Sequence, residues 1–114
     1  MSEAFNKLEL LEEIDNDMEF LAEIFDMLQS DAPVLISKIN DGLNIKNSEA
    51  IWQNAHALKS MVGNFAAHDA YDIAYKLELA GREERLDDVR QTLPLLEIEI
   101  ARFISALDNF INQD

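Results

Sequence analysis

Residues that form turns are scarce in this chain. Its 114 residues include three glycines and two prolines, whereas a sheet protein needs many such residues to reverse its strands. The glycines, at positions 42, 63 and 81, each follow a stretch with helical periodicity. We therefore expect each glycine to be the left-handed residue at the end of a helix, and the chain to be all-α.

A short helix is expected to lead the chain, over about residues 3–13. Phe5, Leu8 and Leu11 recur every three residues in this segment, which places them on one side of a helix. That side is predicted to pack against the rest of the molecule.

The first long helix is expected to begin near Asn16. Asn16 and Glu19, three residues later, resemble a capping box. Pro33 should kink this helix or break it briefly. Its core stripe has spacings of three and four residues and consists of Leu21, Phe25, Leu28, Ala32, Leu35, Ile39 and Leu43.

Three further helices follow in the expected order. They cover about 48–62, about 67–80, and a last stretch that starts between 84 and 87 and ends at about 111. Short loops between them favour antiparallel neighbours. The predicted fold is an all-α, antiparallel up-down-up-down four-helix bundle with a short additional N-terminal helix. It forms a single domain over residues 1–114, with the bundle at about 16–112.

The charge of the chain excludes several classes of function. Acidic residues number 23 and basic residues 9, giving a formal net charge of −14. Nucleic acids and anionic membrane surfaces both need clustered Lys and Arg, so neither is an expected partner. No apolar run approaches the roughly 20 residues that span a bilayer, and residues 1–10 show no secretory signal. We expect a cytoplasmic, monomeric protein.

The helix expected at about 48–62 carries the residues that suggest chemistry. Its buried stripe on a helical wheel is Ile51, Ala55, Leu58, Val62 and Phe65. His56 lies away from this stripe and should face water or the rim of the bundle. Lys59 lies one turn further on the same side, with an exposed side chain, and Gly63 has no side chain to block approach. Trp52, one turn before His56, suggests a contact surface for a partner.

This arrangement has a chemical use. An exposed imidazole with the ordinary pKa of about 6.5 is mostly neutral at neutral pH and is a good nucleophile. A phosphoryl group on it would add negative charge to a domain that is already negative, and Lys59 is the nearest cation that could offset it. The same pair also occurs on solvated faces without a function. Trp52 could likewise lie flat against a neighbouring helix.

Residues 55–67, AHALKSMVGNFAA, resemble the signature of histidine-containing phosphotransfer (HPt) domains. That pattern reads roughly A-H-x-L-K-G, followed by small residues and then N-L-G-A. The residues that match it are His56, Leu58, Lys59 and Asn64. The resemblance extends over about residues 17–107, which is most of the chain.

Three positions depart from the pattern. Phe65 replaces the usual leucine, Ser60 stands at the first glycine, and Ala66 stands at the second. Ser60 and Ala66 are both small, so we expect a partner to approach the histidine closely despite them.

The resemblance implies a role for each matching residue. His56 would be phosphorylated on the ring nitrogen farther from the backbone, Lys59 would stabilise the phosphoryl group, and Ser60 and Gly63 would leave clearance. The phosphoryl group would pass between aspartates of response-regulator receiver domains, such as that of a hybrid sensor kinase, in a multistep phosphorelay. The receiver would bring Mg²⁺. The chain itself would have no cofactor and no ATP site, and would be a stoichiometric carrier and not an enzyme.

Two further features lie near this segment. Glu78, near the edge of its helix, could hydrogen-bond toward His56. Phe20, Met27 and Val34, seven residues apart, form a second apolar stripe on the first long helix. We expect the leading segment to cover this stripe; alternatively, it is a docking surface for the receiver.

Two other functions stay open at this point. The chain could be a non-phosphorylated adaptor that binds a receiver or another signalling partner, with an incidental histidine. A metal-binding bundle is the third possibility, but His56 and His68 lie twelve residues apart, whereas metal pairs on one helix are three or four apart. We expect no metal, and His68 as a surface residue at a helix start.

Overall fold

The structure is a computed structural model that describes residues 3–113. Positions 1, 2 and 114 of the expected domain lie outside the described residues. Within the described range every regular element is a helix, so the all-α expectation is confirmed there. The helices are α1 (Lys7–Glu13), α2 (Met18–Asn44), α3 (Ser48–Gly63), α4 (His68–Arg82) and α5 (Leu86–Ile111).

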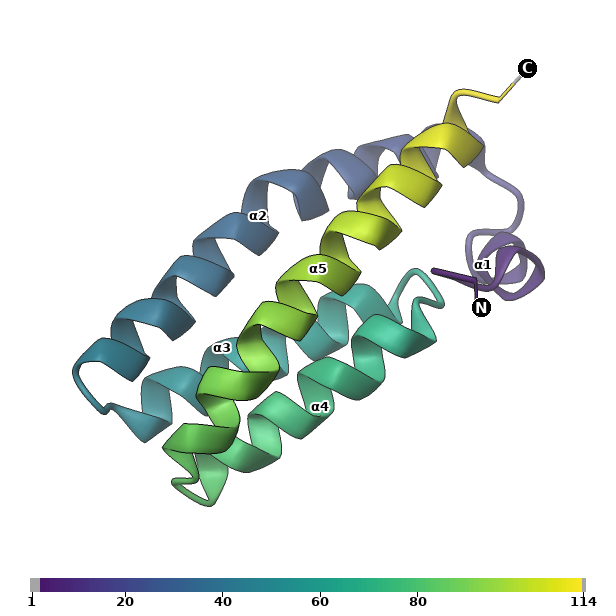
Figure 1. Cartoon of the computed structure of the whole chain (residues 1–114). Coiled ribbons are helices and arrows are strands. Elements are labelled where there is room, and N and C mark those ends of the chain that lie inside the picture. The colour runs from purple at the N-terminus through teal and green to yellow at the C-terminus, as the bar shows by residue number, and fades with distance from the viewer. Residues whose placement is uncertain (1–2, 114) are drawn as a thin grey trace.

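The four long helices form a bundle around one apolar core. Each contacts the next along the chain, and α5 also contacts α2, so the four lie side by side (Figure 1). All four contribute buried side chains, and each large one stabilises the fold by about 1.5–3 kcal/mol. The largest fully buried residues include Leu21, Leu28, Ile51, Leu58, Leu77, Leu96 and Phe103. Among the described helices, none has the length and apolarity needed to cross a membrane.

Side chains cap the starts of two long helices. The carboxylate of Asp17 accepts a hydrogen bond of 3.0 Å from the backbone N–H of Phe20, and the side chain of Asn47 accepts one of 3.1 Å from Ala50. The capping box predicted at Asn16 is therefore wrong by one residue. Asn16 has a φ of 58° and belongs to the turn after α1, where a short polar side chain tolerates the left-handed conformation.

The glycines do not end the helices as predicted. None of them has a positive φ; in the three connections of the bundle this conformation falls to Lys46, Ala66 and Glu84, each with a φ of 57°. The connections 45–47, 64–67 and 83–85 thus turn the chain with non-glycine residues, at a cost of about 1–2 kcal/mol each.

The glycines serve the packing of helices. A Cβ atom on Gly81 would lie 2.9 Å from Cγ2 of Ile51 and 3.1 Å from the backbone nitrogen of Trp52. The α3 and α4 backbones can approach this closely only because position 81 has no side chain. A Cβ atom on Gly63 would meet the ring of Tyr71 at 3.1 Å, so the same two helices are also close at the other end of α3.

The leading helix begins later than expected. Asn6 caps α1, because its side chain accepts a hydrogen bond of 3.0 Å from the backbone N–H of Glu9. Starting the helix at Lys7 instead of residue 3 turns Leu8 outward, where it is 77% exposed, and buries Leu10 instead. The predicted stripe of every third residue from Phe5 was therefore wrong for Leu8.

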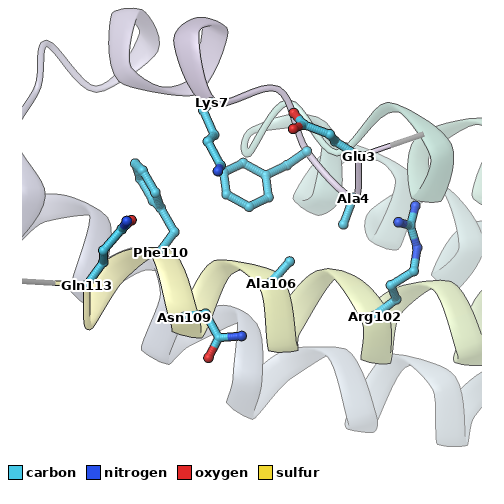
Figure 2. Close-up of a pocket in the computed structure, with 9 residues that line it drawn as sticks. Glu3, Ala4, Lys7, Arg102, Ala106, Asn109, Phe110 and Gln113 are labelled. Atoms are coloured by element: carbon cyan, nitrogen blue, oxygen red, sulfur yellow. The ribbon is translucent and has the colours of Figure 1, made fainter. Parts of the chain in front are cut away.

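The segment before α1 closes one end of the bundle. The ring of Phe5 packs edge-on against Phe103 and Phe110, with centroids 6.0 and 5.6 Å apart. The backbone N–H of Asn6 donates a 2.9 Å hydrogen bond to the carbonyl of Ala66, in the connection after α3. Figure 2 shows the neighbouring Ala4 above α5.

The leading segment leaves the second apolar stripe of α2 largely exposed, although Glu13 at its end lines a groove together with Phe20 and Met27. Phe20, Met27 and Val34 are 45%, 62% and 51% exposed. The expectation that they would be buried was wrong, because Phe5 anchors the segment over the end of α5 instead.

Candidate functional site

His56 stands on the outer side of α3. Its neighbours along the helix, Ala55 and Leu58, are fully buried, and the wheel geometry turns the imidazole to the rim, where 51% of the side chain is exposed. The ring nitrogen Nδ1 lies 3.2 Å from Oε1 of Glu78 on α4. The structure thus makes the contact that the sequence suggested between these two side chains. The other nitrogen, Nε2, makes no hydrogen bond within the described part of the chain.

Glu78 is the centre of a charged cluster. Its side chain is only 5% exposed, and its Oε1 also lies 2.9 Å from Nζ of Lys59. Its Oε2 accepts a 3.0 Å hydrogen bond from Nε of Arg82, one turn further along α4. A buried carboxylate is costly unless it is paired, and three partners meet that condition here. We call Glu78, His56, Lys59 and Arg82 the Glu78 cluster.

These contacts shift two pKa values. Burial raises the pKa of Glu78, but the hydrogen bonds from Lys59, Arg82 and His56 outweigh it and hold this pKa below its ordinary value. For Lys59, the hydrogen bond to Glu78 raises the pKa and burial opposes it; the net pKa lies above its ordinary value. Glu78 and Lys59 are therefore both charged at neutral pH.

Lys59 is less exposed than expected. Its side chain is 14% exposed, because α4 packs against this flank of α3. Its ammonium lies 4.9 Å from the ring centre of Tyr75 and 5.9 Å from that of Tyr71, both on α4, in favourable cation–π range. The wheel of α3 places Lys59 away from the core stripe, but it carries no information on which neighbour covers that side.

Trp52 packs against α4 instead of standing free. It is half-buried, and the guanidinium of Arg82 stacks on its indole at 3.8 Å from the ring centre. This is the flat packing that sequence reasoning left open. Arg82 itself was missed, although its position four residues after Glu78 is a signal for an ion pair on one helix face.

The small residues around His56 lie at the surface. Ser60 and Gly63 are both exposed on α3, so neither covers the imidazole with a large side chain. Ala66, by contrast, is buried and has a φ of 57°. It stands where the HPt pattern has its second glycine, and the left-handed backbone gives a physical reason for glycine there.

An apolar groove lies on the other flank of α3. Its apolar walls include Phe20, Ile24 and Met27 from α2, and Ala57 and Met61 from α3. Three polar residues, Glu13, Asp31 and Asn64, also line it. Ala57 directly follows His56 in the sequence, so the groove and the imidazole lie on two sides of the same exposed ridge of α3.

His68 lies apart from this site. It is exposed at the first residue of α4, and its Nε2 lies 2.6 Å from Oε2 of Glu9 on α1. Within residues 3–113, no group of three or more His, Asp or Glu side chains could hold a metal ion.

Comparison with known families identifies the chain. The family model described as Hpt domain matches residues 23–109, which include all of α3 and α4 and so every member of the Glu78 cluster. Searches of curated proteins and of solved structures found no significant match. The family match confirms the resemblance carried by residues 55–67. The chain therefore belongs to the HPt domain family, whose members are phosphocarriers with a histidine phosphotransfer role in two-component signalling and interact with receiver domains.

Proposed function

We propose that this chain is a phosphorelay carrier in which His56 accepts a phosphoryl group from one receiver aspartate and passes it to another. The observation that carries the proposal is the half-exposed imidazole with Nδ1 against Glu78. This contact supports the tautomer with the proton on Nδ1, which leaves the Nε2 lone pair for the phosphorus. The chain would act as one domain, a monomer, with the antiparallel up-down-up-down order that the short connections favour.

The transfer step needs little from the chain besides position and charge. Nε2 attacks phosphorus, the bond from phosphorus to the receiver's aspartyl oxygen breaks, and the electron pair returns to the aspartate. Catalysis of such a step rests on alignment and on electrostatic stabilisation. The chain is therefore proposed as a stoichiometric carrier without an ATP site. The cytoplasmic location expected from the sequence stays a prediction.

Lys59 is the proposed partner of the phosphoryl group, and the structure refines how it acts. Its ammonium is bound to Glu78 at 2.9 Å, so the new anion must share it with that carboxylate. Lys59→Ala should slow transfer about 10- to 150-fold, since a hydrogen bond to a charged group is worth about 1.5–3 kcal/mol. Stopped-flow transfer from a phosphorylated receiver measures this, and wild-type rates would contradict the electrostatic role.

The groove between α2 and α3 is the proposed docking surface. Phe20 and Met27 line it and are 45% and 62% exposed; Trp52, with Ser60 and Gly63 beside His56, would complete the contact. Met27→Glu should weaken receiver-dependent labelling of His56 by about 10-fold or more, because a charge would be buried in an apolar contact. Val34→Glu is the matched control, since Val34 belongs to the same stripe, is 51% exposed and does not line the groove.

Labelling with a panel of phosphorylated receivers tests the function itself. We expect an acid-labile, base-stable phosphate on the wild type and on His68→Gln, and none on His56→Gln. His68 is the matched control because it is the other histidine and is exposed as well. Binding of a receiver without any transfer of label would instead favour an adaptor role.

A further inference from the structure

The carboxylate of Glu78 faces Nδ1, the nitrogen that does not take part in bond formation. Nδ1 and Oε1 lie 3.2 Å apart, and the Glu78 side chain is 5% exposed. A buried carboxylate favours a proton on the nitrogen next to it. If Nδ1 lost that proton, its lone pair would point at a negative oxygen, so the cluster disfavours this state.

Once His56 is phosphorylated, the Nδ1 proton determines the charge with which the ring leaves phosphorus. When Nε2 of a neutral imidazole bonds to phosphorus and the aspartyl oxygen leaves, the ring keeps its Nδ1 proton and becomes a cation. In the return step that cation leaves as neutral imidazole when the P–N bond breaks. A ring that had lost the proton would leave as imidazolate, which is a far poorer leaving group.

The charges around the ring favour the cationic state. The positive charges of Lys59 and Arg82 and the negative charge of Glu78 add up to one net positive charge. A phosphoryl group adds about two negative charges. A proton on the ring then brings the assembly close to neutrality. The other titratable groups facing it from α4 are Tyr71 and Tyr75, against Lys59. Within residues 3–113, no hydrogen bond or ion pair joins this cluster to α2 or α5.

We propose that Glu78 is a positioning residue that keeps the proton on Nδ1 of His56 through the whole phosphoryl cycle, so that the phosphorylated ring always leaves as neutral imidazole. The proposal rests on the proposed role of His56. Its consequence is a carrier that neither takes up nor releases a ring proton, and that transfers its phosphoryl group at a rate that hardly depends on pH near neutrality.

The pH profile of Glu78→Gln tests this. The amide keeps the size of the side chain and an oxygen that can accept from Nδ1, but removes the charge. Each protein is phosphorylated with phosphoramidate, and single-turnover transfer to the same receiver is timed from pH 6 to 9. The ratio of wild-type to variant rates should rise with pH, and the increase should approach about 10-fold per pH unit once the variant's ring has lost its Nδ1 proton. The ratio cancels the receiver's own titration.

The control variant is Glu97→Gln, which removes one exposed carboxylate from α5. Its rates should match the wild type at every pH. A wild-type to Glu78→Gln ratio that stays constant from pH 6 to 9 overturns the proposal, because a purely structural loss would lower the rate equally at all pH values.

A second measurement needs no variant. In ¹⁵N NMR of the phosphorylated wild type at pH 8, Nδ1 should still give the signal of a protonated ring nitrogen, and a deprotonated signal overturns the proposal. The proposed function fails in a different way, namely if phosphoramidate and phosphorylated receivers leave His56 without label.

Discussion

Replacing Glu78 by Gln should lower the stability of the domain in a manner that depends on pH. The three partners of the carboxylate, His56, Lys59 and Arg82, lie 3.2, 2.9 and 3.0 Å away. Hydrogen bonds to charged groups contribute about 1.5–3 kcal/mol when shielded. Only Lys59, 14% exposed, meets that condition, whereas His56 and Arg82 are 51% and 45% exposed and so contribute little.

The expected loss at pH 7 is about 2 kcal/mol, because the amide of Gln keeps one accepting oxygen but has no charge. The folded-state pKa of Glu78 is depressed, so its contribution is fully present above the unfolded-state pKa, which is ordinarily about 4.3. It is lost as the pH falls through the folded-state value. The gap between wild type and variant should therefore close in acid, where protonated Glu78 has the same charge as Gln.

Urea denaturation followed by circular dichroism, repeated from pH 3 to pH 8, measures this gap. Glu97→Gln should stay within about 0.5 kcal/mol of the wild type at every pH, as exposed substitutions do. A gap below about 0.5 kcal/mol at pH 7, or one that persists unchanged at pH 3, would refute the claim that the charge of Glu78 stabilises the fold.

Three further predictions concern packing and backbone conformation, and thermal unfolding checks each. Gly81→Ala should destabilise the domain by about 1–3 kcal/mol, because backbone and Cβ atoms of α3 lie within 3.2 Å of the added carbon. Gly63→Ala should be neutral or stabilising by up to about 1 kcal/mol, because its added carbon meets only an exposed ring. Equal effects of the two variants would contradict this account of the α3–α4 approach. Glu84→Gly should stabilise the domain by up to about 1 kcal/mol, because it relieves the strain of a positive φ. Glu83→Gly, at a φ of −90°, should destabilise it by about 0.5–1 kcal/mol. A Glu83→Gly variant more stable than Glu84→Gly would contradict the strain at position 84. Phe5→Ala should cost about 3–5 kcal/mol, since the ring is 3% exposed, and a loss below about 1 kcal/mol would show that the leading segment is not part of the core.

The helices could be predicted from apolar spacing because that spacing records which face is buried. Leu21, Phe25, Leu28 and Ile39 of the first stripe are all buried. The ends of the helices were harder to predict from the sequence. Sequence reasoning assigned the left-handed positions to glycines, but the close approach of α3 to α4 required a glycine at position 81. Such a contact depends on two helices at once and leaves no signal in either one alone.

For the site, the sequence predicted what depends on α3 alone but, apart from that of Glu78, not the contacts that α4 makes with it. The outward direction of His56 follows from the wheel of α3, and the HPt pattern pointed to Lys59. The burial of Lys59 could not be predicted, because it depends on Tyr71 and Tyr75 from another helix. The stacking of Arg82 on the indole could not be predicted either, because it crosses from α4 to α3, whereas the spacing of four residues from Glu78 was a readable signal for the ion pair.

The folding unit is longer than the stretch that matches the family. The match begins at residue 23, yet the core also contains Phe5, Leu10, Ile14 and Leu21, which are at most 6% exposed. A fragment trimmed to the matching residues would lose these side chains and the hydrogen bond from Asn6 to the connection after α3. Any shortened version made for binding or crystallisation work should therefore keep the residues from position 4 onward. Otherwise the low stability of the fragment would be mistaken for a property of the site.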